Sequence, residues 1–144
     1  MRVVAGRYKG HNLKTLKGEA TRPTTMRVKE SLFSSLTSAL GSFDGLNVLD
    51  AFAGSGALGI EALSRGAAHV TFFEKSRQAV QVVRDNLNKV HAAPDAYTLE
   101  MGDTLKSAER LRSRCFDLVF LDPLMRSSPK QCSRTSKRWP HPVL

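Results

Sequence analysis

The feature that most constrains this chain is a short apolar run that leads directly into a glycine-rich turn. Residues 48–59 read Val-Leu-Asp-Ala-Phe-Ala-Gly-Ser-Gly-Ala-Leu-Gly. Glycines let a backbone turn tightly and approach a ligand without Cβ clashes, and a helix that begins near Ala57 directs its free N–H groups at that ligand. The segment therefore predicts a strand, a ligand-binding turn and a helix in succession.

The carboxylate of Asp50, at the end of this strand, indicates the chemistry of the ligand. A pyrophosphate loop has little use for a negative charge beside two phosphates, whereas a cation gains from it. S-adenosylmethionine is such a ligand, because it carries a sulfonium and an ammonium. However, Gly54, Gly56 and Gly59 also satisfy the G-x-G-x-x-G fingerprint of dinucleotide-binding proteins, so an NAD-binding protein remains an alternative. Phe52 before the turn, and an Asp-Pro pair after a later strand, favour the methyl donor.

Beyond this turn, segments whose apolar residues have the pattern of a strand alternate with segments whose apolar residues recur at helical spacing. The pattern predicts strands at 46–50, 69–73, 97–101 and 116–121, and helices at 57–65, 77–90 and 104–112. Such alternation is typical of an α/β protein with a parallel sheet and right-handed crossovers.

The segment before the first strand has a different character. Residues 2–6 and 11–16 predict a hairpin with a basic and aromatic tip. A helix capped by Thr24 or Thr25 should follow Pro23 and end at Gly41. Its apolar stripe is expected to exclude Arg27 and Lys29 and to consist of Val28, Leu32, Phe33, Leu36 and Leu40.

The candidate site residues follow the ends of the predicted strands, where open α/β sheets bind their ligands. Ser55 lies in the glycine-rich turn, and Glu74 is placed to accept hydrogen bonds from both hydroxyls of a ribose. After the third strand come Gly102 and Asp103. The carboxylate of Asp103 is expected either to accept from an adenine amino group or to cap the next helix. The pair Asp122-Pro123 follows the fourth strand, at the expected place for reaction chemistry.

Charge and composition narrow the class of partner. Residues 1–30 carry eight Lys/Arg and two acidic residues, residues 31–123 carry nine and eleven, and residues 124–144 carry five and none. A basic arm on a nearly neutral core is suited to nucleic acid, and a solvated basic surface is the alternative.

Other classes of protein are disfavoured by the sequence. The two cysteines and four histidines have no metal-ligand spacing, so we predict no metal. Because the sequence has no long apolar segment, we expect no membrane span and no signal peptide. A cytoplasmic protein is therefore expected.

Three blocks of sequence together resemble one known family, the bacterial 16S ribosomal RNA guanine-N2 methyltransferases (RsmD family). The resemblance extends over residues 1–123, and the blocks that carry it are residues 2–10, residues 21–30 and residues 49–62. Met26 departs from it, since the family more often has an acidic residue there.

The resemblance implies a fold, an activity and a set of functional residues. The expected fold is the Rossmann-like sheet of class I S-adenosylmethionine-dependent methyltransferases, ending after its fourth strand and preceded by a basic hairpin or arm. The implied reaction transfers a methyl group to the exocyclic N2 of a guanine, on ribosomal RNA or an assembling small ribosomal subunit. Asp122 and Pro123 match the start of the family's Asp/Asn-Pro-Pro-Tyr-like catalytic motif. The expected RNA contacts are Arg7, Lys9, Arg22 and Arg27.

The match to the motif stops after Pro123, because Leu124-Met125 stands where the resemblance predicts Pro-Tyr. Deletion of one base from the second proline codon converts Asp-Pro-Pro-Tyr-Ala into Asp-Pro-Leu-Met-Arg, the sequence of residues 122–126. We therefore hypothesise a frameshift in the gene or its sequencing. A genuine shortened variant is the alternative.

Three parts of the chain are accordingly expected. Residues 1–25 form the basic arm, residues 26–123 form the Rossmann-like core, and residues 124–144 form a non-homologous basic tail predicted to be disordered. A chain with this altered end should methylate poorly. A non-catalytic RNA-binding module remains an alternative function.

Overall fold

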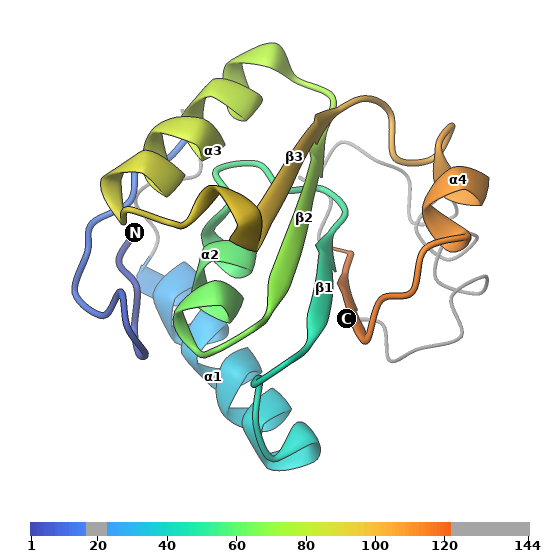
Figure 1. Ribbon diagram of the computed structural model, residues 1–144. Coiled ribbons are helices and arrows are strands. Elements are labelled where there is room, and N and C mark those ends of the chain that lie inside the picture. The colour runs from blue at the N-terminus through green and yellow to red at the C-terminus, as the bar shows by residue number, and fades with distance from the viewer. Residues whose placement is uncertain (17–22, 122–144) are drawn as a thin grey trace.

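The computed structural model describes residues 1–16 and 23–121 (Figure 1). The elements within these ranges are α1 (Pro23–Leu40), β1 (Asn47–Asp50), α2 (Ala57–Ser64), β2 (His69–Glu74), α3 (Arg77–Lys89), a 3-10 turn η1 (Pro94–Ala96), β3 (Tyr97–Met101), α4 (Ala108–Arg112) and β4 (Leu118–Phe120). The predicted alternation of strands and helices is thus confirmed, with α4 starting four residues later than expected.

The four strands form one parallel sheet in the order β3-β2-β1-β4. Leu49 of β1 is level with Thr71 of β2 on one side and with Val119 of β4 on the other. Because all four strands run in the same direction, their carboxyl ends meet at one edge. The predicted α/β class and parallel sheet are confirmed.

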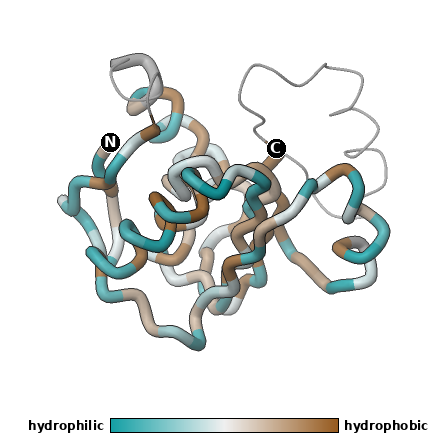
Figure 2. The backbone as a smooth tube through the Cα atoms, turned by 90° about the horizontal axis from the view of Figure 1, so that it is seen from above, coloured by the Kyte–Doolittle hydropathy of each residue, from teal (hydrophilic) through white to brown (hydrophobic). Residues whose placement is uncertain are grey.

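Alternate residues of the central strands supply two separate hydrophobic clusters. Val48, Phe72 and Phe120 pack on the larger one, together with residues of α1, α2, α3 and the N-terminal segment. Leu49 and Val119 face the other side of the sheet, toward α4 and its flanking residues. Figure 1 shows α1, α2 and α3 on one face of the sheet and α4 on the opposite face. Figure 2 shows hydrophobic stretches along the strands and hydrophilic residues on the outer turns of the chain.

Helix α1 departs from its predicted pattern at two positions. Val28, expected in the apolar stripe, is 65% exposed, whereas Lys29, expected outside it, is 3% exposed. Phe33 and Leu36 are buried as predicted, and the helix ends at Gly41 with a positive φ of 77°. The stripe is therefore displaced by one residue in the first described turns, and a lysine enters the interior.

The predicted N-terminal hairpin is present but has little β-structure. One isolated antiparallel bridge joins Arg2 to Asn12, and flanking backbone hydrogen bonds join Val3 to His11 and Leu13 to Met1. The strands expected at 2–6 and 11–16 are not formed as such within the described residues. Instead of extending a sheet, residues 1–16 lie against α2 and α3 (Figure 1).

Close packing of α2 on β2 depends on Gly59. A Cβ atom at this position would lie 2.3 Å from Cε1 and 2.8 Å from Cζ of Phe72, a buried ring in the core. Contacts that short are not tolerated, so the helix could approach the sheet this closely only with glycine there.

We expect Gly59→Ala to lower the free energy of unfolding by about 1–3 kcal/mol, because overpacking outweighs the gain in helix propensity. Urea unfolding measures the change. In a Phe72→Leu background, where the clashing ring atoms are gone, the same substitution should cost much less. An equal loss in both backgrounds would show that the contact with the ring is not the cause.

Candidate functional site

The glycine-rich turn between β1 and α2 is fixed by backbone hydrogen bonds at the carboxyl edge of the sheet. The Ala53 N–H donates to the Phe73 carbonyl at 3.1 Å, and the Gly56 N–H donates to the Ala53 carbonyl at 2.7 Å. Gly54 and Gly56 have φ values of 58° and 83°, which side chains disfavour. The turn predicted from the sequence is therefore present, and its two central glycines adopt a backbone conformation suited to glycine.

Asp50 lies beneath this turn, with only 2% of its surface exposed. Its Oδ2 accepts a hydrogen bond from the Gly59 N–H at 3.0 Å, within the first turn of α2. Gly56, the N-cap residue of α2, supplies no side-chain cap, so the acceptor comes from β1 instead. A carboxylate at a helix N-terminus offsets the positive potential of the exposed N–H groups.

Glu74, at the end of β2, binds the turn from the neighbouring strand. Its Oε2 accepts from the Gly54 N–H at 2.8 Å, and its Oε1 accepts from the N–H groups of Lys75 and Ser76, both at 3.0 Å. A carboxylate has about four acceptor positions, of which these three donors use all but one. A ligand diol that bonded with both hydroxyls would have to replace one of these backbone donors.

The loop after β3 is bound to the loop after β1 by a residue that the sequence analysis did not single out. The hydroxyl of Thr104, which is buried, donates to the carbonyl of Ala51. Gly102 donates its N–H to the Glu74 carbonyl at 3.0 Å. Oδ1 of Asp103 accepts from the N–H groups of Leu105 and Lys106, which lie in a turn before α4. Because α4 begins only at Ala108, with Ser107 as its N-cap residue, Asp103 does not cap the helix as one alternative expected.

The edge thus brings together most of the predicted cofactor residues. Glu74 is bonded to the glycine-rich turn and to Gly102, and Asp50 is bonded to the first turn of α2. Phe52 is half-buried against the smaller hydrophobic cluster. Ser55 is buried and contributes its backbone carbonyl, which accepts from Nδ2 of Asn86 at 2.9 Å. Asp122 and Pro123 lie outside the described residues.

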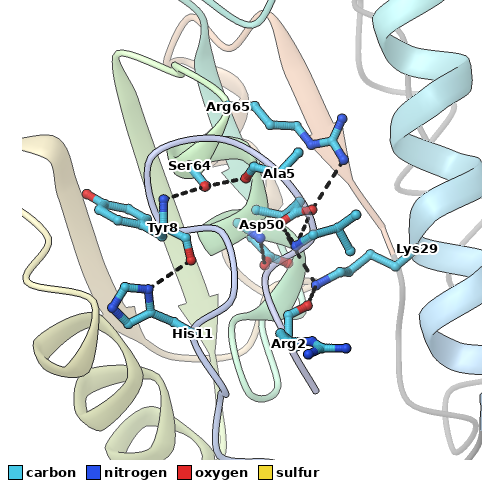
Figure 3. A network of polar contacts seen from close by, with 11 residues as sticks. Arg2, Ala5, Tyr8, His11, Lys29, Asp50, Ser64 and Arg65 are labelled. Carbon is cyan, nitrogen blue, oxygen red and sulfur yellow. Dashed lines mark hydrogen bonds and ion pairs between the residues drawn. The ribbon is translucent and has the colours of Figure 1, made fainter.

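Residues 1–16 are held on α2 by two of its side chains (Figure 3). Both carboxylate oxygens of Glu61 lie 3.1 Å from the Val4 nitrogen and accept its N–H. The hydroxyl of Ser64 donates to the Ala5 carbonyl and accepts from the Tyr8 N–H. A Cβ at Gly6 would lie 1.9 Å from the Ser64 carbonyl oxygen, so the segment approaches α2 as closely as a backbone can.

Lys29 completes this network from α1. Its ammonium donates to the Arg2 carbonyl at 2.8 Å and lies 4.0 Å from Oε2 of Glu61, which Arg65 also contacts at 3.3 Å through Oε1. Desolvation lowers the pKa of the Lys29 ammonium below its usual value of 10.5, and the Glu61 carboxylate offsets part of that effect. A polar residue within an otherwise apolar helix, such as Glu61, was the available signal for this cluster.

The described candidates for RNA contact are all on the surface. Arg7 and Lys9 are exposed at the tip of the N-terminal turn, and Arg27 is exposed on α1. Arg22 lies outside the described residues. Within residues 1–16 and 23–121 no group of three or more His, Cys, Asp or Glu side chains is placed to hold a metal ion. None of the helices in that part of the chain is both long and apolar enough to cross a bilayer.

Comparison with known proteins identifies the family. Residues 1–134 match the profile of the family described as Conserved hypothetical protein 95. The chain belongs to that family. The Bacillus subtilis (strain 168) protein YlbH is 44% identical over 125 residues, which cover 85% of this chain and 66% of that protein.

Two further comparisons place the Conserved hypothetical protein 95 family among methyltransferases. Ribosomal RNA small subunit methyltransferase D of Haemophilus influenzae is 37% identical over 124 residues, 85% of this chain and 63% of the relative. The solved structure of yhhF from Escherichia coli superposes with a TM-score of 0.77 at 31% identity, covering 95% of this chain and 72% of the other. The sheet is the Rossmann-like sheet of class I methyltransferases, as predicted. The chain spans slightly less than two thirds of the length of the two curated relatives.

The buried ammonium of Lys29 makes stability depend on pH in a defined direction. Between the lowered pKa of the folded state and 10.5, the unfolded chain binds more protons, so stability rises with pH in this window. Relative to Lys29→Met, the wild-type chain should therefore gain stability between pH 7 and pH 10 in urea unfolding.

The exposed Lys89 of α3 offers a control, since Lys89→Met removes a lysine without changing a buried charge. Its stability difference from wild type should stay constant over the same pH range. A difference between wild type and Lys29→Met that is constant, or that shrinks as pH rises, would contradict the buried-ammonium interpretation.

Proposed function

We propose that this chain binds S-adenosylmethionine and belongs to an enzyme that methylates the exocyclic N2 of a guanine in small-subunit ribosomal RNA. The observation that carries the proposal is the buried carboxylate of Asp50 at the end of β1, which is bonded to the first turn of α2 beneath a glycine-lined turn. A bare helix N-terminus attracts anions such as pyrophosphate, whereas one neutralised by a carboxylate suits a ligand with positive groups.

The names of the relatives support the class of substrate. The Haemophilus influenzae relative is a ribosomal RNA small subunit methyltransferase, and so is the Escherichia coli (strain K12) relative, which is 35% identical over 126 residues. Both share the part of their length that contains the described sheet. Family membership supports the proposed cofactor and class of RNA for this chain.

The residues of the carboxyl edge fit such a cofactor. Gly54 and Gly56 carry no side chains, and Ser55 between them is buried, so a ligand could approach the backbone of the turn closely. Glu74 keeps one acceptor position for a ribose hydroxyl, and Asp103 follows β3, on the side expected for adenine. When bound, S-adenosylmethionine supplies an activated methyl group on a sulfonium, so the protein is left mainly with positioning.

Positioning the guanine is the demanding part of the reaction. The lone pair of an exocyclic guanine amine is delocalised into the ring, so it must be held in line with the methyl carbon at near-attack distance. An acceptor facing the amine helps its lone pair to localise as the new bond forms. We assign this role to the carboxylate of Asp122, with Pro123 fixing the backbone beside it.

The basic surface of the N-terminal segment is proposed to contact RNA. Arg7 and Lys9 project from a turn that is bonded to α2, and Arg27 adds a third exposed positive group, with Arg22 completing the assigned set. Contacts with phosphate give affinity with little sequence preference, and a flipped guanine is then read in the pocket.

A thermal shift separates the methyl-donor site from a dinucleotide site. S-adenosylhomocysteine should raise the melting temperature of the chain, and NAD should not. Asp50→Ala should abolish the shift, whereas Asp95→Ala, at the opposite end of the sheet, should preserve it. Stabilisation by NAD instead of S-adenosylhomocysteine would identify a nicotinamide-dependent protein.

RNA binding should depend on salt and on the N-terminal turn. Replacing Arg7 and Lys9 together by Ala should weaken binding of a small-subunit RNA fragment and reduce the slope of log affinity against log salt by about 2. The exposed Lys89→Ala variant of α3 should keep the wild-type slope. Unchanged RNA affinity in the double variant would reject the turn as the RNA contact. If S-adenosylhomocysteine does not affect RNA binding by the wild-type chain, and no methyl group is transferred, a non-catalytic RNA-binding module would be favoured.

The substituted motif after Pro123 leads us to propose impaired turnover in this chain. Leu124 and Met125 replace the Pro-Tyr that would complete the base pocket. Calorimetric titration with S-adenosylmethionine should show weak binding, and a radiolabel assay on small-subunit RNA should show little or no transfer. Brisk turnover by the purified 144-residue chain would refute the impairment.

A further inference from the structure

Asn86 of α3 joins the N-terminal segment to the glycine-rich turn through one buried side chain. Its Nδ2 donates to the Ser55 carbonyl at 2.9 Å and to the Lys14 carbonyl at 3.0 Å. Its Oδ1 accepts from the Lys14 N–H at 2.7 Å. The side chain has no exposed surface. All three bonds go to backbone atoms of two segments that lie 41 residues apart in sequence.

Packing alone does not account for an amide at this position. Asn86 lies on the buried stripe of α3 beside Leu87 and one turn after Val83, where an apolar side chain would ordinarily fill the space. Burying an amide is costly unless its donors and acceptors are bonded. Here two donors and one acceptor are satisfied, and each bond fixes either the turn or the N-terminal segment.

The same segment is also bound to the far end of α2. Glu61 and Ser64 hold the backbone of residues 4–8, while Asp50 holds the first turn of the helix through Gly59. Figure 3 shows the Ser64 hydroxyl bonded to both Ala5 and Tyr8. Residues 1–16 therefore bond directly with the end of α2 and, through Asn86, with the glycine-rich turn that precedes it.

We propose that Asn86 is a positioning residue that couples docking of residues 1–16 to the shape of the cofactor turn. The affinity for an S-adenosyl ligand then depends on the docked segment, and the ligand in turn stabilises docking, because such coupling is reciprocal. The inference rests on the proposed function, since it takes the turn to be the cofactor site. It adds a link between the cofactor and the segment that carries Arg7 and Lys9.

The substitution Asn86→Asp tests the link with little change in shape. The carboxylate still accepts from the Lys14 N–H but loses both donors, including the one to Ser55. We expect about tenfold weaker binding of S-adenosylhomocysteine in calorimetric titration. Asn88→Asp, on the exposed face two residues further along α3, is the matched control and should bind as wild type does.

Hydrogen exchange supplies a measurement that a merely structural role would not change. In the wild-type chain S-adenosylhomocysteine should slow exchange of the Lys14 amide, which is outside the cofactor turn. In Asn86→Asp, at ligand concentrations that saturate the site, this slowing should be lost. Both measurements are made at a temperature where urea unfolding shows each variant to be folded.

A second pair of variants acts from the other end of the segment. Gly6→Ala forces a Cβ against the Ser64 carbonyl, whereas Gly10→Ala has the same left-handed backbone, with φ of 90° against 87°, and open space around the new Cβ. The coupling predicts that Gly6→Ala binds S-adenosylhomocysteine about fivefold more weakly than the wild-type chain. Gly10→Ala should bind it with wild-type affinity.

The outcomes distinguish the inference from the function on which it rests. If the wild-type chain does not bind S-adenosylhomocysteine, both are rejected. If wild type binds, and Asn86→Asp and Gly6→Ala bind equally well with ligand-induced slowing at Lys14 retained, the coupling alone is rejected. Should Asn86→Asp not fold, the comparison of Gly6→Ala with Gly10→Ala decides.

Discussion

The hydrogen bond between the Asp50 carboxylate and the Gly59 N–H is the contact on which the geometry of the site depends. It ties the end of β1 to the first turn of α2 and buries a negative charge under the glycine-rich turn. Gly59 lets α2 approach β2 closely enough for this bond, since any side chain there would meet Phe72. The packing of a helix on a sheet and the charge of a ligand site are thus set by the same two residues.

The other loops of the edge are bonded to this turn and to one another. Glu74 binds the turn from β2, and Thr104 binds the end of β1 from the loop after β3. Because side-chain carboxylates and isolated backbone carbonyls accept these hydrogen bonds, the loops are held without forming regular structure. A parallel sheet supplies the common edge, and these few polar side chains fix the loops that surround it.

The N-terminal segment shows how a basic region can be held beside such a site. It forms a single β-bridge, buries Val3 and Leu13 in the larger hydrophobic cluster, and bonds through its backbone to Glu61, Ser64 and Asn86. Its exposed cations remain on the surface while its backbone is fixed. This arrangement separates affinity for RNA, which we assign to exposed basic side chains, from docking, which uses the main chain and buried apolar side chains.

Hydrophobic periodicity and the glycine pattern were enough to predict the sheet, its helices and the grouping of Asp50, Glu74 and Gly102 at one edge. Those features are local in sequence. The sequence did not reveal the roles of Lys29 and Asn86, whose partners are backbone atoms 27 and 72 residues away along the chain. A polar residue on an apolar stripe signals a buried contact but not its partner. The roles of all the candidate residues in cofactor binding, RNA binding and catalysis stay predictions, for Asp50 and Glu74 as much as for Asp122.

A crystal structure of the chain with S-adenosylhomocysteine tests the central claim most directly. We expect the ligand to be bound at the turn of residues 54–56, with its ribose beside Glu74. The hydrogen bond between Asp50 and Gly59 should be retained. An empty turn at saturating ligand, or a pyrophosphate-bearing nucleotide bound there in its place, would contradict a site shaped for a cationic methyl donor.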